Sequence, residues 1–177
     1  MATTTFDIVR EQSGIDWTGR KINGSHNGTI GIQAGTITLE NDKVTGGKFV
    51  IDTKSIKILD VTDPGTNAQF AGHLGSDDFF SSDAFPTAVF ETNAVVPIKT
   101  GLYHVDGSLT IKGITAPVEF DVTVAINGST IKASGKMTVD RTLYGMKFRS
   151  GNFFKDLGDT LIYNDFDLTV HITASAA

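Results

Sequence analysis

Short turns that contain glycine divide this chain into stretches in which apolar and polar residues alternate. Such alternation is the pattern of a β-strand with one buried face. Asn-Gly between two alternating stretches is a strong β-hairpin signal, because both central residues of the turn need a positive φ. Ile, Val and Thr also outnumber Ala and Leu, and β-branched side chains fit a pleated sheet. The chain is therefore predicted to be all-β.

The turn at Asn127-Gly128 can be tested by its register, because residues that share a buried face must pair with one another. A two-residue loop there pairs Val124 with Ile131, and the apolar faces of the two strands coincide. On the opposite face it sets Glu119 against Lys136, a favourable pair of opposite charges. The sequence thus predicts a hairpin around this turn.

Two further turns extend this hairpin into a larger sheet. A loop at Thr100-Gly101 pairs Ala94 with Gly107, and a loop at Lys112-Gly113 keeps the same residues on the inner face. Residues 88–140 are therefore predicted to form a four-stranded antiparallel meander.

The N-terminal part of the chain repeats the pattern. Hairpin turns are expected at Asn23-Gly24 and at Ala34-Gly35, and Gly46-Gly47 indicates a bulge or a looser turn. A last strand is expected at about residues 160–173.

Residues 54–87 interrupt the alternation. A short helix is predicted from Asn67 to Leu74, with Gly75 at its end. Asp77-Asp78 then fits the N-terminal cap of a second helical turn better than a catalytic pair of carboxylates. This insertion joins the two halves of the sheet and is expected to cover one end of a barrel.

About ten strands, each with one apolar face, need closure or a partner sheet to bury that face. Both a sandwich and a closed barrel satisfy this, and the inner face mixes large with small residues. These residues either fill a core or line an apolar lumen that holds a ligand. The expected lining consists of Trp17, Ile30, Phe49, Ile51, Phe90, Ala94, Val96, Val105, Gly107, Leu109, Phe120, Val122, Ala133, Gly135, Met137, Phe166, Leu168 and Val170.

Two polar residues share this inner face near one end of the predicted sheet. The Asn23-Gly24 register sets Lys21 opposite His26. Such groups are either solvated at protruding strand ends or form a polar rim that meets a ligand head group.

Composition excludes several classes of protein. With no cysteine, the chain has no disulfide, thiolate metal site or cysteine nucleophile. The net charge of −5 without a basic cluster argues against nucleic-acid binding, and no apolar run is long enough for a transmembrane helix. The length suits a single domain, residues 1–177. The N-terminus shows no export signal, so a cytoplasmic location is expected as written, or a periplasmic one if a leader has been removed.

A series of short motifs resembles the YceI-like family. Together they extend over most of the chain in the order of that family. The motifs are Trp17–Lys21, Gly24–Gly28, Gly46–Asp52, Ser55-Ile56, His73-Leu74, Ser76–Phe80, Phe85–Phe90, Tyr103–Thr115, Asp140–Gly145 and Leu157–Asp159.

The resemblance implies an extended, antiparallel, lipocalin-like β-barrel with a short helical insertion. It implies non-catalytic binding of a long-chain isoprenoid lipid, either a polyprenyl phosphate precursor or the tail of an isoprenoid quinone. Transport and storage of that lipid are both compatible with such binding. No cofactor is expected besides the lipid, and the oligomeric state, including a homodimer, stays open.

Histidine chemistry provides an alternative from a different class. His26 and His73, with Asp77, would form a metal site of an enzyme or stress factor only if the insertion folds over the barrel mouth. His104 and His171 are expected on outward faces.

Three further expectations concern packing. Arg141 is expected to pair with Asp140 or Asp159. The pairs Phe79-Phe80 and Phe153-Phe154 are expected to pack under loops. A third interpretation of the whole chain is a structural barrel with a filled core.

Overall fold

The strands are long and antiparallel, as their alternating sequences predict. The computed structural model describes residues 3–21, 24–147 and 162–176. The described elements are β1 (Thr3–Ile8), η1 (Arg10–Gln12), β2 (Gly14–Lys21), β3 (Gly24–Glu40), β4 (Lys43–Ile58), α1 (Pro64–Leu74), β5 (Thr87–Lys99), β6 (Leu102–Ile111), β7 (Ile114–Asn127), β8 (Thr130–Asp140), η2 (Arg141–Tyr144) and β9 (Ile162–Ala176).

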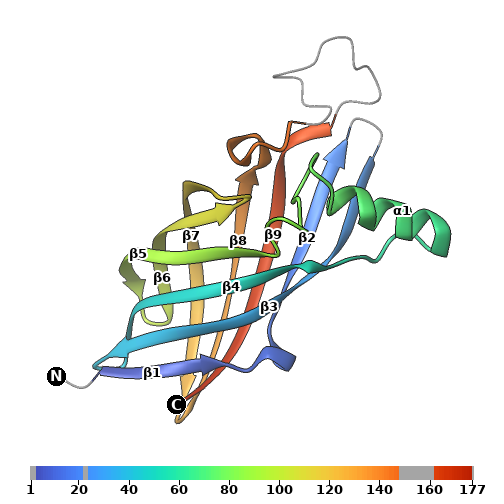
Figure 1. Cartoon of the computed structure of the whole chain (residues 1–177). Coiled ribbons are helices and arrows are strands. Elements are labelled where there is room, and N and C mark those ends of the chain that lie inside the picture. The colour runs from blue at the N-terminus through green and yellow to red at the C-terminus, as the bar shows by residue number, and fades with distance from the viewer. Residues whose placement is uncertain (1–2, 22–23, 148–161, 177) are drawn as a thin grey trace.

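The sheet closes on itself to form a barrel with eight strand positions (Figure 1). Both β1 and β2 pair with β3 on one side and with β9 on the other, so together they fill one position, interrupted by η1. The β3–β4 ladder completes the circle. This confirms the predicted antiparallel, lipocalin-like barrel and buries the apolar face of every strand against the others.

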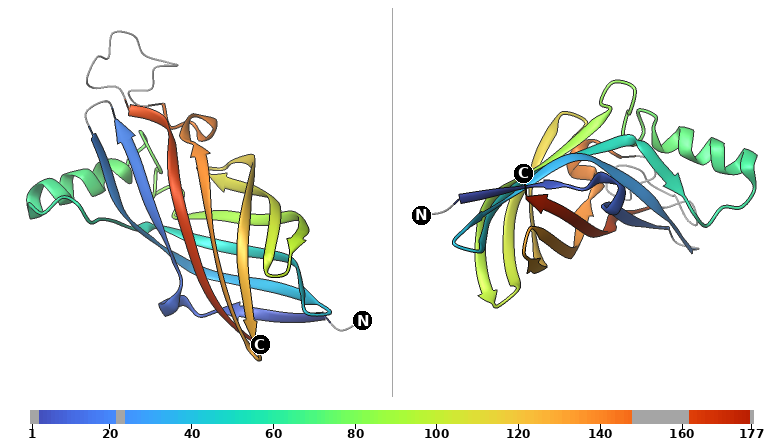
Figure 2. Two further views of the ribbon diagram at one scale, coloured as in Figure 1. Left: turned by 180° about the vertical axis from the view of Figure 1, so that it is seen from behind. Right: turned by 90° about the horizontal axis from the view of Figure 1, so that it is seen from below.

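The two ends of the barrel differ. α1 and η2 lie at one end, whereas both chain termini lie near the other (Figures 1 and 2). The predicted helix is confirmed, although it begins at Pro64 rather than Asn67. Asp63 caps it by accepting a hydrogen bond from the Thr66 N–H, and Gly75 follows its last residue. Within the described ranges, no helix combines the length and apolar character needed to cross a bilayer.

The predicted meander forms, but the registers around Gly101 and Gly128 differ from the predicted ones. The Lys112-Gly113 turn pairs residues as expected, including Leu109 with Ala116. In the next hairpin Val124 pairs with Ala133, because the loop consists of Gly128 and Ser129. This shift of two residues leaves every side chain on its predicted face. The predicted Glu119–Lys136 pairing is wrong, because the β7–β8 ladder starts at Val122 and Gly135 and Glu119 lies outside it.

A bulge in β5 overturns the predicted facing of two residues. The register shifts between Thr92 and Ala94, so that Thr92 lies opposite Gly107 while Ala94 lies opposite Asp106. The extra residue inverts the alternation of the strand. Ala94 and Val96 are therefore exposed on the outside, and the prediction that they face the interior is wrong.

The N-terminal hairpins also differ from expectation. The predicted Asn23-Gly24 turn includes Asn23, which lies outside the described residues. Beside it, Trp17 pairs with Gly28 rather than with Ile30, and Lys21 pairs with Gly24 rather than with His26. The turn predicted at Ala34-Gly35 is wrong, because β3 continues unbroken to Glu40.

The chain reverses instead at Asn41-Asp42, where both residues have positive φ. These residue types tolerate that conformation. Gly46-Gly47 lies within β4 beside a register shift, in agreement with the predicted bulge.

Aromatic rings cover glycines on the inner face. A Cβ atom at Gly107 would lie 2.4 Å from the Phe90 ring and 2.9 Å from the Glu91 carbonyl oxygen. The space that the sequence suggests at Gly107 is therefore occupied by Phe90.

Gly107→Val is expected to lower the free energy of unfolding by about 1–3 kcal/mol, because the new side chain forces Phe90 and the backbone apart. Urea denaturation measures the change. Gly19→Ala is the matched control, since a Cβ at Gly19 meets no atom within 4 Å. Equal stability of the two variants would contradict this account of the packing.

Candidate functional site

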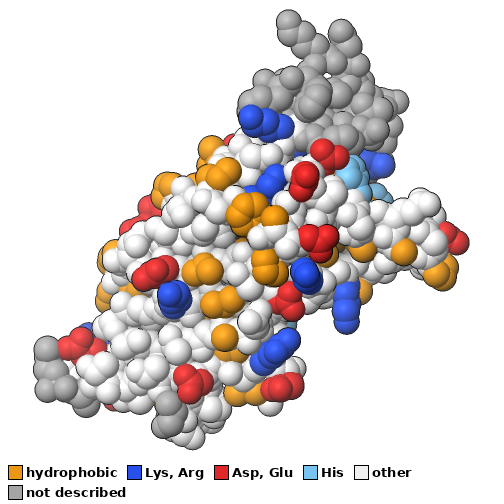
Figure 3. Space-filling model, in the orientation of Figure 1, with side chains coloured by type: hydrophobic (Ala, Val, Ile, Leu, Met, Phe, Trp, Pro, Cys, Tyr) orange, Lys and Arg blue, Asp and Glu red, His pale blue; other side chains and the backbone are white. Residues whose placement is uncertain are grey.

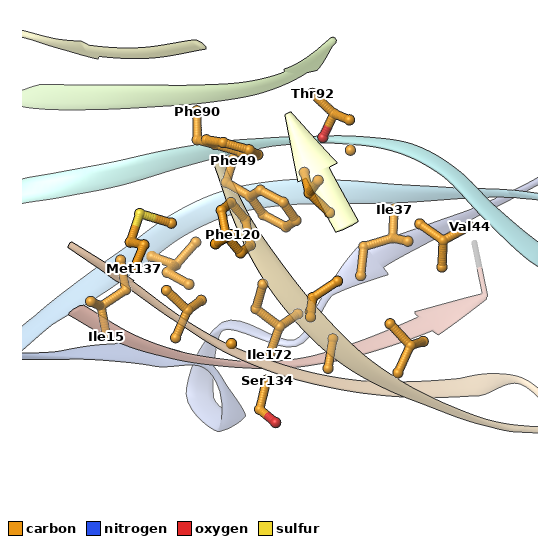
Figure 4. Close-up of a pocket in the computed structure, with 18 of the residues that line it drawn as sticks. Ile15, Ile37, Val44, Phe49, Phe90, Thr92, Phe120, Ser134, Met137 and Ile172 are labelled. Atoms are coloured by element: carbon orange, nitrogen blue, oxygen red, sulfur yellow. The ribbon is translucent and has the colours of Figure 1, made fainter. Parts of the chain in front are cut away.

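The barrel interior contains an apolar cavity of about 100 Å³ (Figure 4). Its walls come from every strand position of the barrel, and aliphatic and aromatic side chains dominate them. Thr92 and Ser134 are the polar side chains among its lining residues. The site therefore offers burial and few directional contacts, which suits a hydrocarbon chain.

Three phenylalanines narrow this inner cavity. The rings of Phe49 and Phe90 stack with centroids 6.1 Å apart, and Phe120 contacts Phe90 edge-on at 5.6 Å. Figure 4 shows them grouped between Met137 at one end and Val44 at the other. Rotation of these three rings would change the width of the cavity.

A second cavity, of about 560 Å³, opens at the end of the barrel that carries α1. Its volume is in the range of small-molecule sites. Leu168 lines both cavities, so they adjoin at this residue of β9. The two cavities are thus neighbours, one at the barrel mouth and one at its centre.

Basic side chains surround the wider cavity. Among the described residues, its lining includes Arg20, Lys21, His26, His73 and Arg141, against one carboxylate, that of Asp165. Histidine and Lys or Arg side chains lie side by side at this end in Figure 3. The mouth thus combines an apolar floor with a basic rim, including both residues of the predicted polar rim.

Three of these basic residues have carboxylate partners. Arg20 forms an ion pair with Asp167 on the neighbouring strand. Nδ1 of His26 lies 2.9 Å from Asp60, and Nε2 of His73 lies 2.9 Å from Asp78.

Hydrogen bonding has the larger effect on the pKa of the Asp60 carboxyl. Burial would raise the pKa of the Asp60 carboxyl, but hydrogen bonds from the Asn27 N–H and from His26 outweigh it and lower that pKa. His26 also contacts the Phe70 ring edge-on at 4.7 Å. Asp60 and Phe70 therefore hold the His26 ring at the mouth.

Arg141 is the most buried of the basic residues, with 3% of its surface exposed. Its guanidinium donates hydrogen bonds of 2.7–3.1 Å to the carbonyl oxygens of Met146, Ile162 and Tyr163. The predicted pairing with Asp140 is wrong, because that carboxylate caps η2 at the Thr142 N–H instead. Burial lowers the pKa of Arg141, and the negative charge of Asp140, which raises this pKa, offsets only part of the effect.

The histidine alternative gains no geometric support. His26 and His73 line the same cavity, but each is hydrogen-bonded to its own aspartate, and Asp77 accepts a hydrogen bond from Ser81 instead. Within the described part of the chain, the residues His26, His73 and Asp77 do not form a group with metal-ligand spacing.

Most of the predicted lining residues border one of the two cavities. The inner cavity is lined by Phe49, Ile51, Phe90, Val105, Leu109, Phe120, Val122, Ala133, Gly135, Met137, Leu168 and Val170. The mouth is lined by Trp17, Ile30, Phe166 and Leu168, together with Lys21 and His26. Gly107 is buried beneath Phe90, and Ala94 and Val96 lie outside the barrel.

Sequence reasoning missed several lining residues. Val95 lines the inner cavity because the β5 bulge turns it inward, and Thr92 lines it from the same face as Phe90. Phe70 and Arg141 reach the mouth from α1 and η2, which strand alternation does not place. Phe79 is buried as predicted, whereas Phe153-Phe154 and Asp159 lie outside the described residues.

Solved structures share this architecture. BcnA of Burkholderia cenocepacia matches 95% of this chain and 99% of its own, with a TM-score of 0.75 and 22% identity. A polyisoprenoid-binding domain from Saccharophagus degradans, implicated in plant cell wall breakdown, matches 98% of this chain and 99% of its own, with a TM-score of 0.70 and 11% identity. These matches show a common fold.

Sequence relatives show a closer connection. A UPF0312 protein of Vibrio parahaemolyticus is 30% identical over 98 residues, which cover 55% of this chain and 52% of the relative. A UPF0312 protein of Staphylococcus aureus is 39% identical over 85 residues, 43% of this chain and 46% of the relative. The chain thus spans about half the length of the curated relatives it matches. The model of the YceI-like domain matches residues 6–174, and the chain belongs to the YceI-like family.

Proposed function

We propose that this protein binds a long-chain isoprenoid lipid without chemically changing it. The observation that carries the proposal is the pair of neighbouring cavities, one at the basic mouth and one at the barrel centre, that share Leu168 and that a long tail would span together. The polyisoprenoid-binding domain of similar fold supports the same class of ligand. Binding of this kind needs no cofactor beyond the lipid.

The tail supplies most of the binding free energy in this proposal. Each buried CH₂ group contributes about 0.8 kcal/mol, so several isoprene units bind tightly by burial alone. The inner cavity is narrow, and the Phe49, Phe90 and Phe120 rings change rotamer as the tail enters. Such contacts are non-directional, and selectivity along the tail is therefore low.

The mouth selects the head group. Lys21 and the neighbouring basic side chains favour an anionic head, as in a polyprenyl phosphate. An isoprenoid quinone has a neutral head that accepts hydrogen bonds, and the same donors would suit it less well. A barrel with a mouth at one end and an enclosed interior is compatible with both transport and storage of the lipid.

Extraction of the purified protein tests the proposal. We expect organic solvent to release a lipid with the mass of a polyprenyl phosphate or an isoprenoid quinone, in near-equal molar ratio to protein. Delipidated protein should then take up added polyprenyl phosphate. A lipid-free protein that takes up neither lipid class would refute the proposal.

Substitutions at the mouth separate lipid binding from histidine chemistry. His73→Ala should leave tail uptake nearly unchanged, because the tail binds deeper in the barrel. A His26- and His73-dependent metal enzyme would instead lose its function and its metal in this variant. Elemental analysis of both proteins distinguishes the two outcomes.

A further inference from the structure

A polar cluster lies on the outer face of the β6–β7 ladder, and its residues do not line either cavity. His104 and Asp106 project from β6, and they pair across the ladder with Asp121 and Glu119 of β7, respectively. Alternation along each strand places all four side chains on one face. Three carboxylates therefore surround one imidazole.

The imidazole is oriented as in metal sites of proteins. Its Nδ1 lies 2.8 Å from Asp121 Oδ1, within hydrogen-bond distance. Its Nε2 faces the other two carboxylates, 3.4 Å from Asp106 Oδ1 and 3.5 Å from Glu119 Oε1. A carboxylate that accepts the proton of one ring nitrogen leaves the lone pair of the other available for a metal.

One oxygen of the cluster has no hydrogen bond. Asp106 Oδ1 is shielded from solvent and has no hydrogen-bond partner in the described part of the chain, although the Asp106 side chain as a whole is 41% exposed. It faces His104 Nε2, and it belongs to the residue directly opposite Glu119. Like charges opposed across a ladder destabilise it.

In the described part of the chain, His104 itself is the one basic partner of these carboxylates. Among residues 3–21, 24–147 and 162–176, no lysine or arginine nitrogen lies within 4.0 Å of these carboxylates. The cluster therefore draws positive charge to the space beside Nε2.

We propose that His104, Asp106 and Glu119 bind a divalent transition-metal ion, with Asp121 as the positioning residue for the imidazole. The three ligand atoms lie within 4.8 Å of one another. Tetrahedral zinc with bonds of about 2.0–2.2 Å separates its ligand atoms by roughly 3.3–3.6 Å. The two separations from His104 Nε2, 3.4 and 3.5 Å, match this spacing, and the Asp106 and Glu119 oxygens lie within 4.8 Å of each other.

The donor set defines the class of cation. An imidazole nitrogen favours zinc and its neighbours over magnesium and calcium, which prefer oxygen ligands alone. Three protein ligands leave a fourth position for water. The ion would cross-link β6 and β7 and remove the repulsion between Asp106 and Glu119, independently of any lipid in the barrel.

Zinc titration of tag-free, chelator-treated protein tests the proposal, with a chromophoric chelator as competitor. We expect one zinc ion per chain and a melting temperature that rises with zinc concentration. His104→Asn and Asp106→Asn should each weaken zinc binding at least about tenfold, and Asp121→Asn about 10- to 100-fold. All three side chains face outward, so circular dichroism should show intact folding.

His171→Asn is the matched control. His171 is also an exposed histidine on the outer face, but its carboxylate neighbour, Asp16, is 4.0 Å away. This variant should bind zinc like the parent protein. Equal zinc affinity of the His104→Asn and parent proteins would overturn the proposal. Failure to bind zinc, or binding of magnesium or calcium alone, would also overturn it.

Discussion

Leu168→Trp is expected to reduce uptake of a long-chain isoprenoid lipid by at least about tenfold. Leu168 lines both the mouth and the inner cavity, so the larger indole blocks the passage between them. The lost burial of even a few CH₂ groups, at about 0.8 kcal/mol each, accounts for such a change. Uptake of radiolabelled polyprenyl phosphate by delipidated protein provides the measurement.

The control for this variant uses an outward position. Ala94→Phe adds a bulky aromatic group to the same barrel, but Ala94 is exposed on the outside. It should take up lipid like the parent protein. Overpacking in Leu168→Trp costs about 1–3 kcal/mol of stability, so its folded state is checked by circular dichroism. A folded Leu168→Trp protein with full uptake would show that the tail does not pass Leu168.

Arg141→Met is expected to destabilise the fold more than any surface substitution. Three carbonyl oxygens, of Met146, Ile162 and Tyr163, lose their charged donor. Each buried acceptor left unpaired costs about 1–3 kcal/mol, so the free energy of unfolding falls by about 3 kcal/mol or more. For a chain of this length the melting temperature should fall by roughly 6–12 °C.

Two comparison variants isolate the role of the guanidinium. Arg141→Lys keeps the charge but replaces the planar guanidinium by an ammonium group with fewer N–H donors. Its melting temperature should lie between those of the parent protein and Arg141→Met. Arg20→Met removes an arginine whose ion pair with Asp167 is exposed, and its melting temperature should change little. Equal melting of Arg20→Met and Arg141→Met would contradict the anchoring role of Arg141.

Turn chemistry accounts for much of what could be predicted. The Lys112-Gly113 register is correct because both of these residues adopt the positive φ that a two-residue hairpin turn needs. Around Gly128 the register is shifted by two residues, which alternation cannot detect, since both pairings bury the same face.

Other turns depended on packing across the barrel. Gly35 looked like a turn residue, but a Cβ there would lie 2.5 Å from the Phe49 ring of the adjacent strand. Glycine is therefore required at this position by a ring on β4 rather than by local backbone conformation. Such a requirement is invisible until the β3–β4 register is known.

The sequence by itself determined the strand content, the short helix and which face of most strands turns inward, because alternation is a local property with a period of two. Only the tertiary structure decided that Ala94 and Val96 point outward, since the β5 bulge inserts a residue into that alternation. It alone placed Arg141 at the mouth and His104 among three carboxylates. These arrangements depend on register between strands and on barrel closure, which no single strand encodes.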